Sequence, residues 1–82
     1  NPFNPATTLC YFLPEQTHVT LTVYDLMGKE TIQLVDAIQN VGNKTVQWDG
    51  TDSFGRPVSA GLYLYQVRTS NHTSVGKMAL LK

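Results

Sequence analysis

The stretch from Trp48 to Tyr63 constrains the fold of this chain more than any other, because it places several turn signals between two strand-like runs. Its glycines, Gly50, Gly55 and Gly61, each close a cluster of turn-forming residues. Glycine adopts positive φ at little steric cost, so such clusters favour tight turns over a helix. The stretch therefore predicts a structured connector between two strands. Trp48 and Tyr63, at its two ends, are expected to anchor a small all-β core.

Apolar and polar residues alternate along most of the remaining chain, which is the pattern of half-buried β-strands. The clearest case runs from His18 to Asp25, where valine and leucine alternate with threonine and tyrosine. No segment shows helical periodicity, and the frequent turns between short strands predict a two-layer antiparallel sandwich of about seven strands. The predicted strands are Thr7–Leu13, His18–Asp25, Glu30–Asp36, Lys44–Trp48, Gly61–Thr69 and Thr73–Leu81, with a seventh around Pro57–Val58.

The alternation also predicts which side chains form the core. The first strand is apolar on both faces, which suggests cover on both sides and burial of the single cysteine, Cys10, as a small hydrophobe. In the third strand Ile32 and Leu34 are expected to point inward, and residues 37–42 are expected to form a loop. The core positions predicted in the later strands are Val46, Trp48, Tyr63, Tyr65, Val67, Met78 and Leu80.

The chain has 82 residues, which suffice for one small domain but leave little room for both a core and a deep catalytic cleft. Its six basic and six acidic residues balance, so no charge pattern predicts binding to nucleic acid or to an anionic membrane. A single cysteine excludes an internal disulfide, and no apolar run is long enough to span a bilayer. Because the sequence starts at Asn1 without methionine, we expect a piece of a longer protein.

Few residues suggest chemistry. Asp49 and Asp52 are candidate calcium ligands, but two carboxylates without further acids fit the backbone capping of turns better. His18 and His72 lie near predicted turns without ligand residues at metal-binding spacing, so both are expected on the surface. A catalytic pairing of Cys10 with a histidine is disfavoured, because a strand offers nothing that activates the thiol. The sequence thus predicts no catalytic residue, metal or cofactor.

Four segments resemble a known family, in order and at compatible spacing. They are the entry segment Asn1–Thr8, the hairpin Val23–Glu30, the closing segment Lys77–Lys82, and a central motif within Trp48–Tyr63. Together they are similar to the type A C-terminal sorting domains of the type IX (Por) secretion system. The central motif is shared with the Ig-like domain of the flagellar hook-capping protein, a related module. Its matching residues here are Trp48, Asp49, Gly50, Asp52, Gly55, Pro57, Val58, Gly61 and Tyr63.

The resemblance implies a non-catalytic Ig-like antiparallel β-sandwich, residues 7–82 after a linker at 1–6, that directs a larger secreted protein through this system. The implied partners are the outer-membrane translocon, a surface sortase-like peptidase and a cargo domain N-terminal in the same chain. The implied location is the periplasm in transit and then the cell surface or the medium, and the isolated domain is expected to be a monomer or weak dimer. The residues that match the recognition segment are Lys77, Met78, Leu80, Leu81 and Lys82.

The last strand, Thr73–Lys82, is expected to be an edge strand whose unpaired backbone groups present a rim to the export machinery. The alternative is an Ig-like accessory or spacer module of an extracellular hydrolase that contacts carbohydrate. Such a module would expose a row of aromatic side chains on one sheet, whereas Tyr63 and Tyr65 are predicted to face the core.

Overall fold

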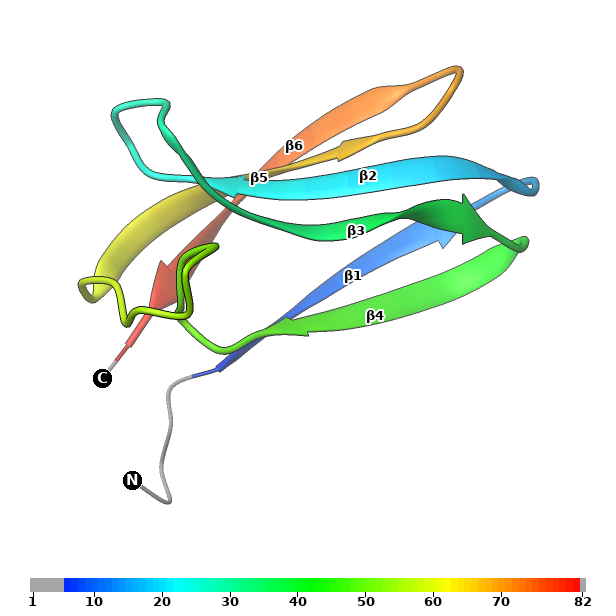
Figure 1. Ribbon diagram of the computed structural model, residues 1–82. Coiled ribbons are helices and arrows are strands. Elements are labelled where there is room, and N and C mark those ends of the chain that lie inside the picture. The colour runs from blue at the N-terminus through cyan, green and yellow to red at the C-terminus, as the bar shows by residue number, and fades with distance from the viewer. Residues whose placement is uncertain (1–5, 82) are drawn as a thin grey trace.

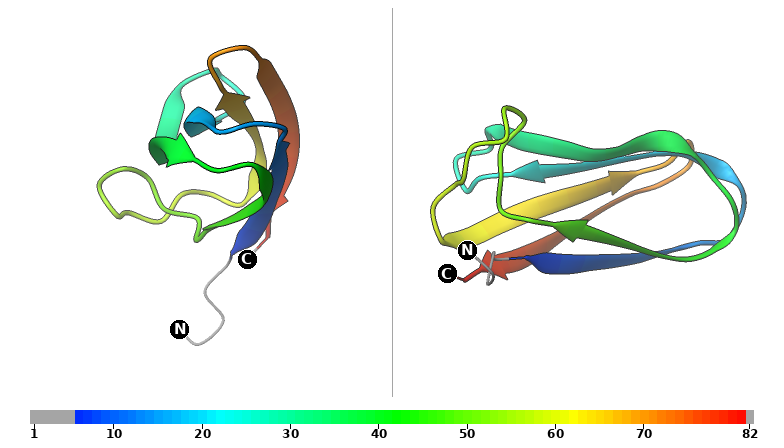
Figure 2. Two further views of the ribbon diagram at one scale, coloured as in Figure 1. Left: turned by 90° about the vertical axis from the view of Figure 1, so that its right-hand side faces the viewer. Right: turned by 60° about the horizontal axis from the view of Figure 1, so that its bottom comes forward.

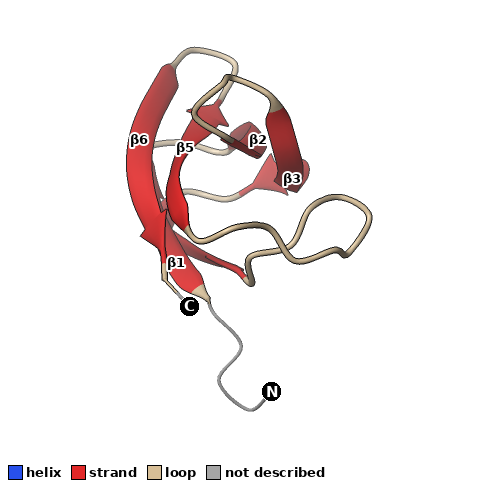
Figure 3. Ribbon diagram, turned by 90° about the vertical axis from the view of Figure 1, so that its left-hand side faces the viewer, coloured by secondary structure: helices blue, strands red, loops and turns tan. Residues whose placement is uncertain are grey.

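The computed structural model describes residues 6–81, which form six strands and no helix (Figures 1 and 3). Most of the predicted linker and Lys82 of the predicted recognition segment lie outside the described residues. The strands are β1 (Thr7–Leu13), β2 (Thr17–Tyr24), β3 (Glu30–Gln39), β4 (Gly42–Trp48), β5 (Gly61–Arg68) and β6 (Thr73–Leu80).

The strands are divided between two facing sheets of unequal size (Figures 1 and 2). β1 and β4 form a two-stranded sheet, and the four-stranded sheet has the order β3-β2-β5-β6. Every pairing is antiparallel. The chain changes sheet between β1 and β2, between β3 and β4, and between β4 and β5, which places the two layers face to face. The antiparallel sandwich predicted from alternation is confirmed.

The described part of the chain has six strands rather than about seven. Pro57 forms only an isolated bridge with Thr51 inside the connector, so the strand predicted around Pro57–Val58 is wrong. Proline has no N–H to donate, and the turns on either side leave too few extended residues to continue a ladder.

The core lies between the sheets and consists of the inward-facing residues of five strands. Trp48 is the largest of the side chains that solvent does not reach. Full burial of one large apolar side chain contributes roughly 1.5–3 kcal/mol, so a core of this size is the main stabilising element. Its buried members are Leu9, Leu13, Val19, Leu21, Val23, Trp48, Tyr63, Val67, Met78 and Leu80.

β3 departs from simple alternation because its register against β2 shifts twice. Leu21 pairs with Val35, and the register then shifts so that Leu34 is an extra residue on β3. Directly opposed side chains of an antiparallel ladder share a face, so Val35 lies beside Leu21 on the core side. Ile32 and Leu34 both pack against the core, as predicted, and Val35 does so as well, because the bulge at Leu34 interrupts the regular alternation.

The connection between β3 and β4 is shorter than predicted. β3 extends to Gln39 and β4 begins at Gly42, so two residues join the two sheets where a loop over residues 37–42 was expected. The last residues of β3 stay extended because they pair with the first residues of β2, as in the pair His18 and Ile38.

The outer face of the two-stranded sheet is open to solvent, which corrects the prediction that β1 is covered on both sides. Cys10 is exposed, and Phe12 retains 60% of its accessible surface. The prediction that Cys10 is buried is therefore wrong. Apolar residues on both faces of a strand do not show how many layers the fold has, and the described residues supply no third layer.

Candidate recognition surfaces

The connector between β4 and β5 is held by hydrogen bonds from its own flanking side chains. Trp48 Nε1 donates to the carbonyl of Thr51 at 2.8 Å, and the hydroxyl of Tyr63 donates to the carbonyl of Ser59 at 2.5 Å. The two rings pack edge to face with centroids 4.9 Å apart and an interplanar angle of 73°. Buried aromatic rings whose polar atoms are satisfied fix both ends of the connector.

Residues 52–56 of the connector form a turn organised by one carboxylate. Asp52 Oδ1 accepts the backbone N–H groups of Phe54 at 2.9 Å and Arg56 at 3.0 Å, and Oδ2 accepts Arg56 Nε at 3.0 Å. The bond from the Arg56 amide, followed by weaker contributions from the Phe54 amide and the Arg56 guanidinium, holds the pKa of Asp52 below its usual value. Gly55, with φ 80°, supplies the left-handed position of the turn.

The turn between β2 and β3, residues 25–29, has the same geometry. Asp25 Oδ1 accepts the amides of Met27 and Lys29, both at 2.9 Å, and Gly28 has φ 86°. Both turns therefore read Asp-x-x-Gly followed by a basic residue. A turn was predicted at each position, and the shared Asp-x-x-Gly spacing is the sequence signal that the two turns are alike.

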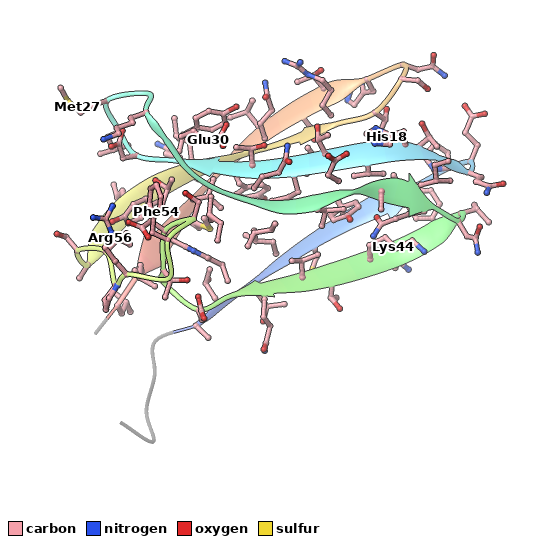
Figure 4. The ribbon with its side chains drawn as sticks, in the orientation of Figure 1. His18, Met27, Glu30, Lys44, Phe54 and Arg56 are labelled. Atoms are coloured by element: carbon pink, nitrogen blue, oxygen red, sulfur yellow. The ribbon has the colours of Figure 1, made fainter. Side chains whose placement is uncertain are left out.

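The two turns lie together at one end of the sandwich, as the positions of Met27, Phe54 and Arg56 in Figure 4 show. The amide of Ser53 donates to the carbonyl of Thr31 at 3.1 Å, which ties the connector to β3. Met27 and Phe54 are 93% and 80% exposed at the tips of their turns. This contact covers part of the edge of β3, so β3 is less available than β6 for pairing with another strand.

Asp49 and Asp52, the candidate calcium ligands in the sequence, both accept hydrogen bonds from within the connector. Asp49 Oδ1 accepts a hydrogen bond from the hydroxyl of Thr51 at 2.6 Å, and both oxygens of Asp52 accept hydrogen bonds of its turn. Within residues 6–81 no three histidine, cysteine, aspartate or glutamate side chains gather closely enough to hold a metal ion. Asp52 caps its turn through backbone N–H groups, the role that the sequence favoured, whereas the hydrogen bond of Asp49 joins it to the side chain of Thr51.

Both histidines lie on the surface, as predicted. His18 Nε2 lies 2.8 Å from Asp36 Oδ1 on the neighbouring strand, and both side chains are more than half exposed. His72 is in the turn between β5 and β6. Such exposed pairs contribute little to stability.

The candidate recognition residues of the last strand alternate between two faces. β6 is an edge strand of the four-stranded sheet, as expected. Met78 and Leu80 are buried in the core, whereas Lys77 is exposed on the outer face and Leu81, just after the strand, is 78% exposed. A partner of the folded domain therefore reaches Lys77 and Leu81 directly but does not reach Met78 or Leu80. The described residues of the predicted recognition group are thus divided between the core and the surface.

Cross-strand neighbours extend this outer face onto β5. Leu62 pairs with Ala79 and Leu64 pairs with Lys77, and these four side chains lie on the side of the sheet away from the core. Leu62 and Ala79 are both exposed. The end of β6 thus carries a small apolar surface with one lysine, next to a free strand edge.

Comparisons with known proteins agree on the architecture. Residues 6–73 match the family model of the FlgD Ig-like domain. The structure of FlgD from P. aeruginosa superposes with a TM-score of 0.73 at 26% sequence identity, covering 92% of this chain and 57% of that one. FlgD from Xanthomonas campestris, which was studied for the hook capping essential for flagellar assembly, gives a TM-score of 0.67 at 22% identity, covering 94% and 56%.

The chain spans a little over half the length of these two solved proteins. No curated protein sequence matched the chain significantly. Among the described residues there is no helix with the length and apolar character needed to cross a membrane. The family model covers most of the chain and the two-sheet architecture agrees with it, so the chain belongs to the FlgD Ig-like domain family.

Proposed function

We propose that this chain is a non-catalytic sorting domain that directs a larger secreted protein through the type IX secretion system to the cell surface or the medium. The proposal rests on the four ordered segments that resemble such domains and on one structural observation, the free edge of β6. The FlgD Ig-like domain is itself a non-catalytic module, so a role in recognition suits the family.

The edge of β6 is suited to strand addition because it is long and regular. β6 pairs with β5 without interruption from Gly61 opposite Leu80 to Arg68 opposite Thr73, and no described strand pairs with its other side. An unbroken strand presents backbone N–H and C=O groups at even spacing to an extended partner. Lys77 lies midway along this strand, and a lysine on an edge discourages pairing with unsuitable partners.

The buried and exposed residues of β6 have different tasks in this proposal. Met78 and Leu80 fasten the strand to the core, whereas Lys77 and Leu81 are available for direct contact with the translocon. A sortase-like peptidase would act on the junction with the cargo and not on the sandwich, because the backbone of regular strands is not accessible to a protease.

The proposal is tested by fusing the chain to the C-terminus of a reporter protein in a bacterium that has this secretion system. We expect the double substitution Lys77→Glu and Leu81→Asp to leave the reporter in the periplasm, because it reverses the charge and polarity of the exposed contact. The matched control is Thr45→Glu with Gln47→Asp, on the exposed face of β4. Deletion of residues 75–82 provides the reference for complete loss of export.

Folding of each variant is checked by the fluorescence of Trp48, the single tryptophan, in the purified domain. If the β6 variant is folded and its reporter still reaches the surface like the parent, the proposed contact is wrong. Retention of the β4 control would also argue against it, since the effect would not be specific to β6.

No observation favours the alternative role in contacting carbohydrate. The strongly exposed aromatic rings among the described residues are Phe12 on β1 and Phe54 in the connector, which do not form a row on one sheet. Tyr63 is buried, and Tyr65 is half-buried against the core. A flat sugar-binding platform needs neighbouring exposed rings.

A further inference from the structure

The sandwich is asymmetric, because a two-stranded sheet faces a four-stranded one. β1 pairs with β4 on one side only, and on its other side it neighbours β6 without forming a ladder. The two strands lie close where β1 begins and β6 ends, and they diverge toward the opposite end of the molecule (Figures 1 and 2). β1 therefore keeps an unpaired edge to which a third strand can be added.

A groove of about 390 Å³ occupies the space between the diverging strands. One wall is the edge of β1 with the turn that follows it, residues 10–15, and the other is the inner face of the β5–β6 hairpin. Val67 and Ser74 are cross-strand partners on that inner face, where Val67 is buried and Ser74 is exposed. The smaller sheet therefore leaves the β6 side of this face, at Ser74, uncovered.

Polar contacts close the end of the groove at the two turns. The hydroxyls of Thr17 and Ser70 are 3.0 Å apart, and the side-chain amide of Asn71 donates to Glu15 Oε1 at 3.3 Å. These contacts join the β1–β2 turn to the β5–β6 turn and keep the walls apart at a fixed spacing.

A tyrosine fills the uncovered inner face next to the groove. The ring of Tyr65 lies over Gly76 on β6, so closely that a Cβ at that glycine would collide with the ring. Further along, Tyr63 and Met78 are both buried beneath the smaller sheet. The uncovered region is thus short and lies beside residues 10–13 of β1.

We propose that this groove receives a short extended segment of a separate polypeptide, which pairs with the free edge of β1 and becomes the third strand of the smaller sheet. The edge from Cys10 to Leu13 spans roughly 13 Å at about 3.3 Å per residue, so the added strand is short. Its alternate side chains point into the groove, whose lining includes Tyr11, Leu13 and Val67, and are apolar, whereas the others face solvent and are polar. Main-chain hydrogen bonds supply affinity, and the side chains in the groove supply specificity.

The charge of the lining favours a basic residue at one end of the segment. Glu15 is the one carboxylate among the lining residues, which include no lysine or arginine. Glu15 follows the end of β1, so in antiparallel pairing it lies beside the N-terminal end of the added strand. A lysine at that end complements the carboxylate.

The probe for the test is a synthetic hexapeptide of one lysine followed by alternating valine and threonine. We expect this peptide to bind the chain and to shift amide resonances of β1 and of the β5–β6 hairpin in a heteronuclear NMR titration. A control peptide with the same side chains but N-methylated backbone at alternate residues lacks the donors for strand pairing and is expected not to bind.

Two substitutions on neighbouring residues of β6 separate the groove from the outer face. Ser74→Trp fills the groove and is expected to weaken peptide binding roughly tenfold or more, the equivalent of about 1.4 kcal/mol. Val75→Trp points away from the groove and is expected to leave binding unchanged. Glu15→Lys is expected to weaken binding of the lysine peptide and not of its counterpart with glutamate in place of lysine.

The proposal is overturned if the hexapeptide does not bind, or if the two tryptophan variants bind it equally well. It is also overturned if the chain forms a dimer in sedimentation experiments that Ser74→Trp disrupts, because the occupant would then be a second copy. The two tests are distinguishable, because the substitutions that test the sorting role are at Lys77 and Leu81, and neither residue lines the groove.

Discussion

At the scale of single residues, the carboxylate of Asp52 is the clearest case of a side chain that determines local backbone structure. Its pKa is lowered from the usual 3.8, chiefly by the Arg56 amide, so its contribution to stability is complete above pH 3.8 and is lost as pH falls through the lower folded value. We expect Asp52→Asn to be less stable than the parent at neutral pH, and the difference to shrink well below pH 3.8. The difference in free energy of unfolding is measured by urea denaturation, followed by the fluorescence of Trp48. Glu30→Gln, an exposed neighbouring carboxylate, is the control, and an equal loss there would contradict the assignment.

Most of the side chains that form the core and hold the connector could be predicted, because the pattern of the sequence leaves few other positions for them. Trp48 is the single tryptophan and ends an alternating run, so its large apolar ring is expected on the core side, where it is fully buried. Cys10 was not predictable, because a small apolar residue is tolerated on either face of a strand and alternation assigns it to one face without saying whether that face is covered. The groove beside β1 was not predictable either, since it depends on the distance between β1 and β6 and not on any local pattern.

At the scale of elements, the two Asp-x-x-Gly turns depend on glycine in a left-handed conformation. Gly55 has φ 80°, and a Cβ there would meet no neighbouring atom, so any cost of substitution comes from the backbone alone. We expect Gly55→Ala to lower the free energy of unfolding by about 1 kcal/mol, and Gly55→Asn to lower it by less, because asparagine tolerates positive φ. Chemical denaturation of both variants tests this. Equal destabilisation by alanine and asparagine would show that positive φ is not the cause.

The strands themselves were predictable to within a few residues, whereas the bulge in β3 was not. No glycine or proline near Leu34 marks a bulge, so the sequence offers no local reason to place an extra residue there. The bulge allows Ile32, Leu34 and Val35 all to pack against the core. The position of the opposite strand alone determines which residue of β3 is left without a pairing partner.

At the scale of the whole molecule, two phenols, half-buried Tyr11 and buried Tyr63, join the layers and make the sandwich sensitive to alkali. Tyr11 of β1 donates its hydroxyl to Gln39 of β3 at 2.5 Å, which links the two sheets, and Tyr63 packs against Trp48. Burial raises the pKa of both tyrosines above 10.0. Because the neutral phenol is favoured in the fold, the stabilisation is complete below pH 10.0 and is lost as pH rises through the folded values. We expect the free energy of unfolding to fall more steeply above pH 10.0 in the parent than in Tyr11→Phe with Tyr63→Phe, measured by urea denaturation across that range. If both proteins lose stability at the same rate, these two phenols do not control the alkaline limit of the fold.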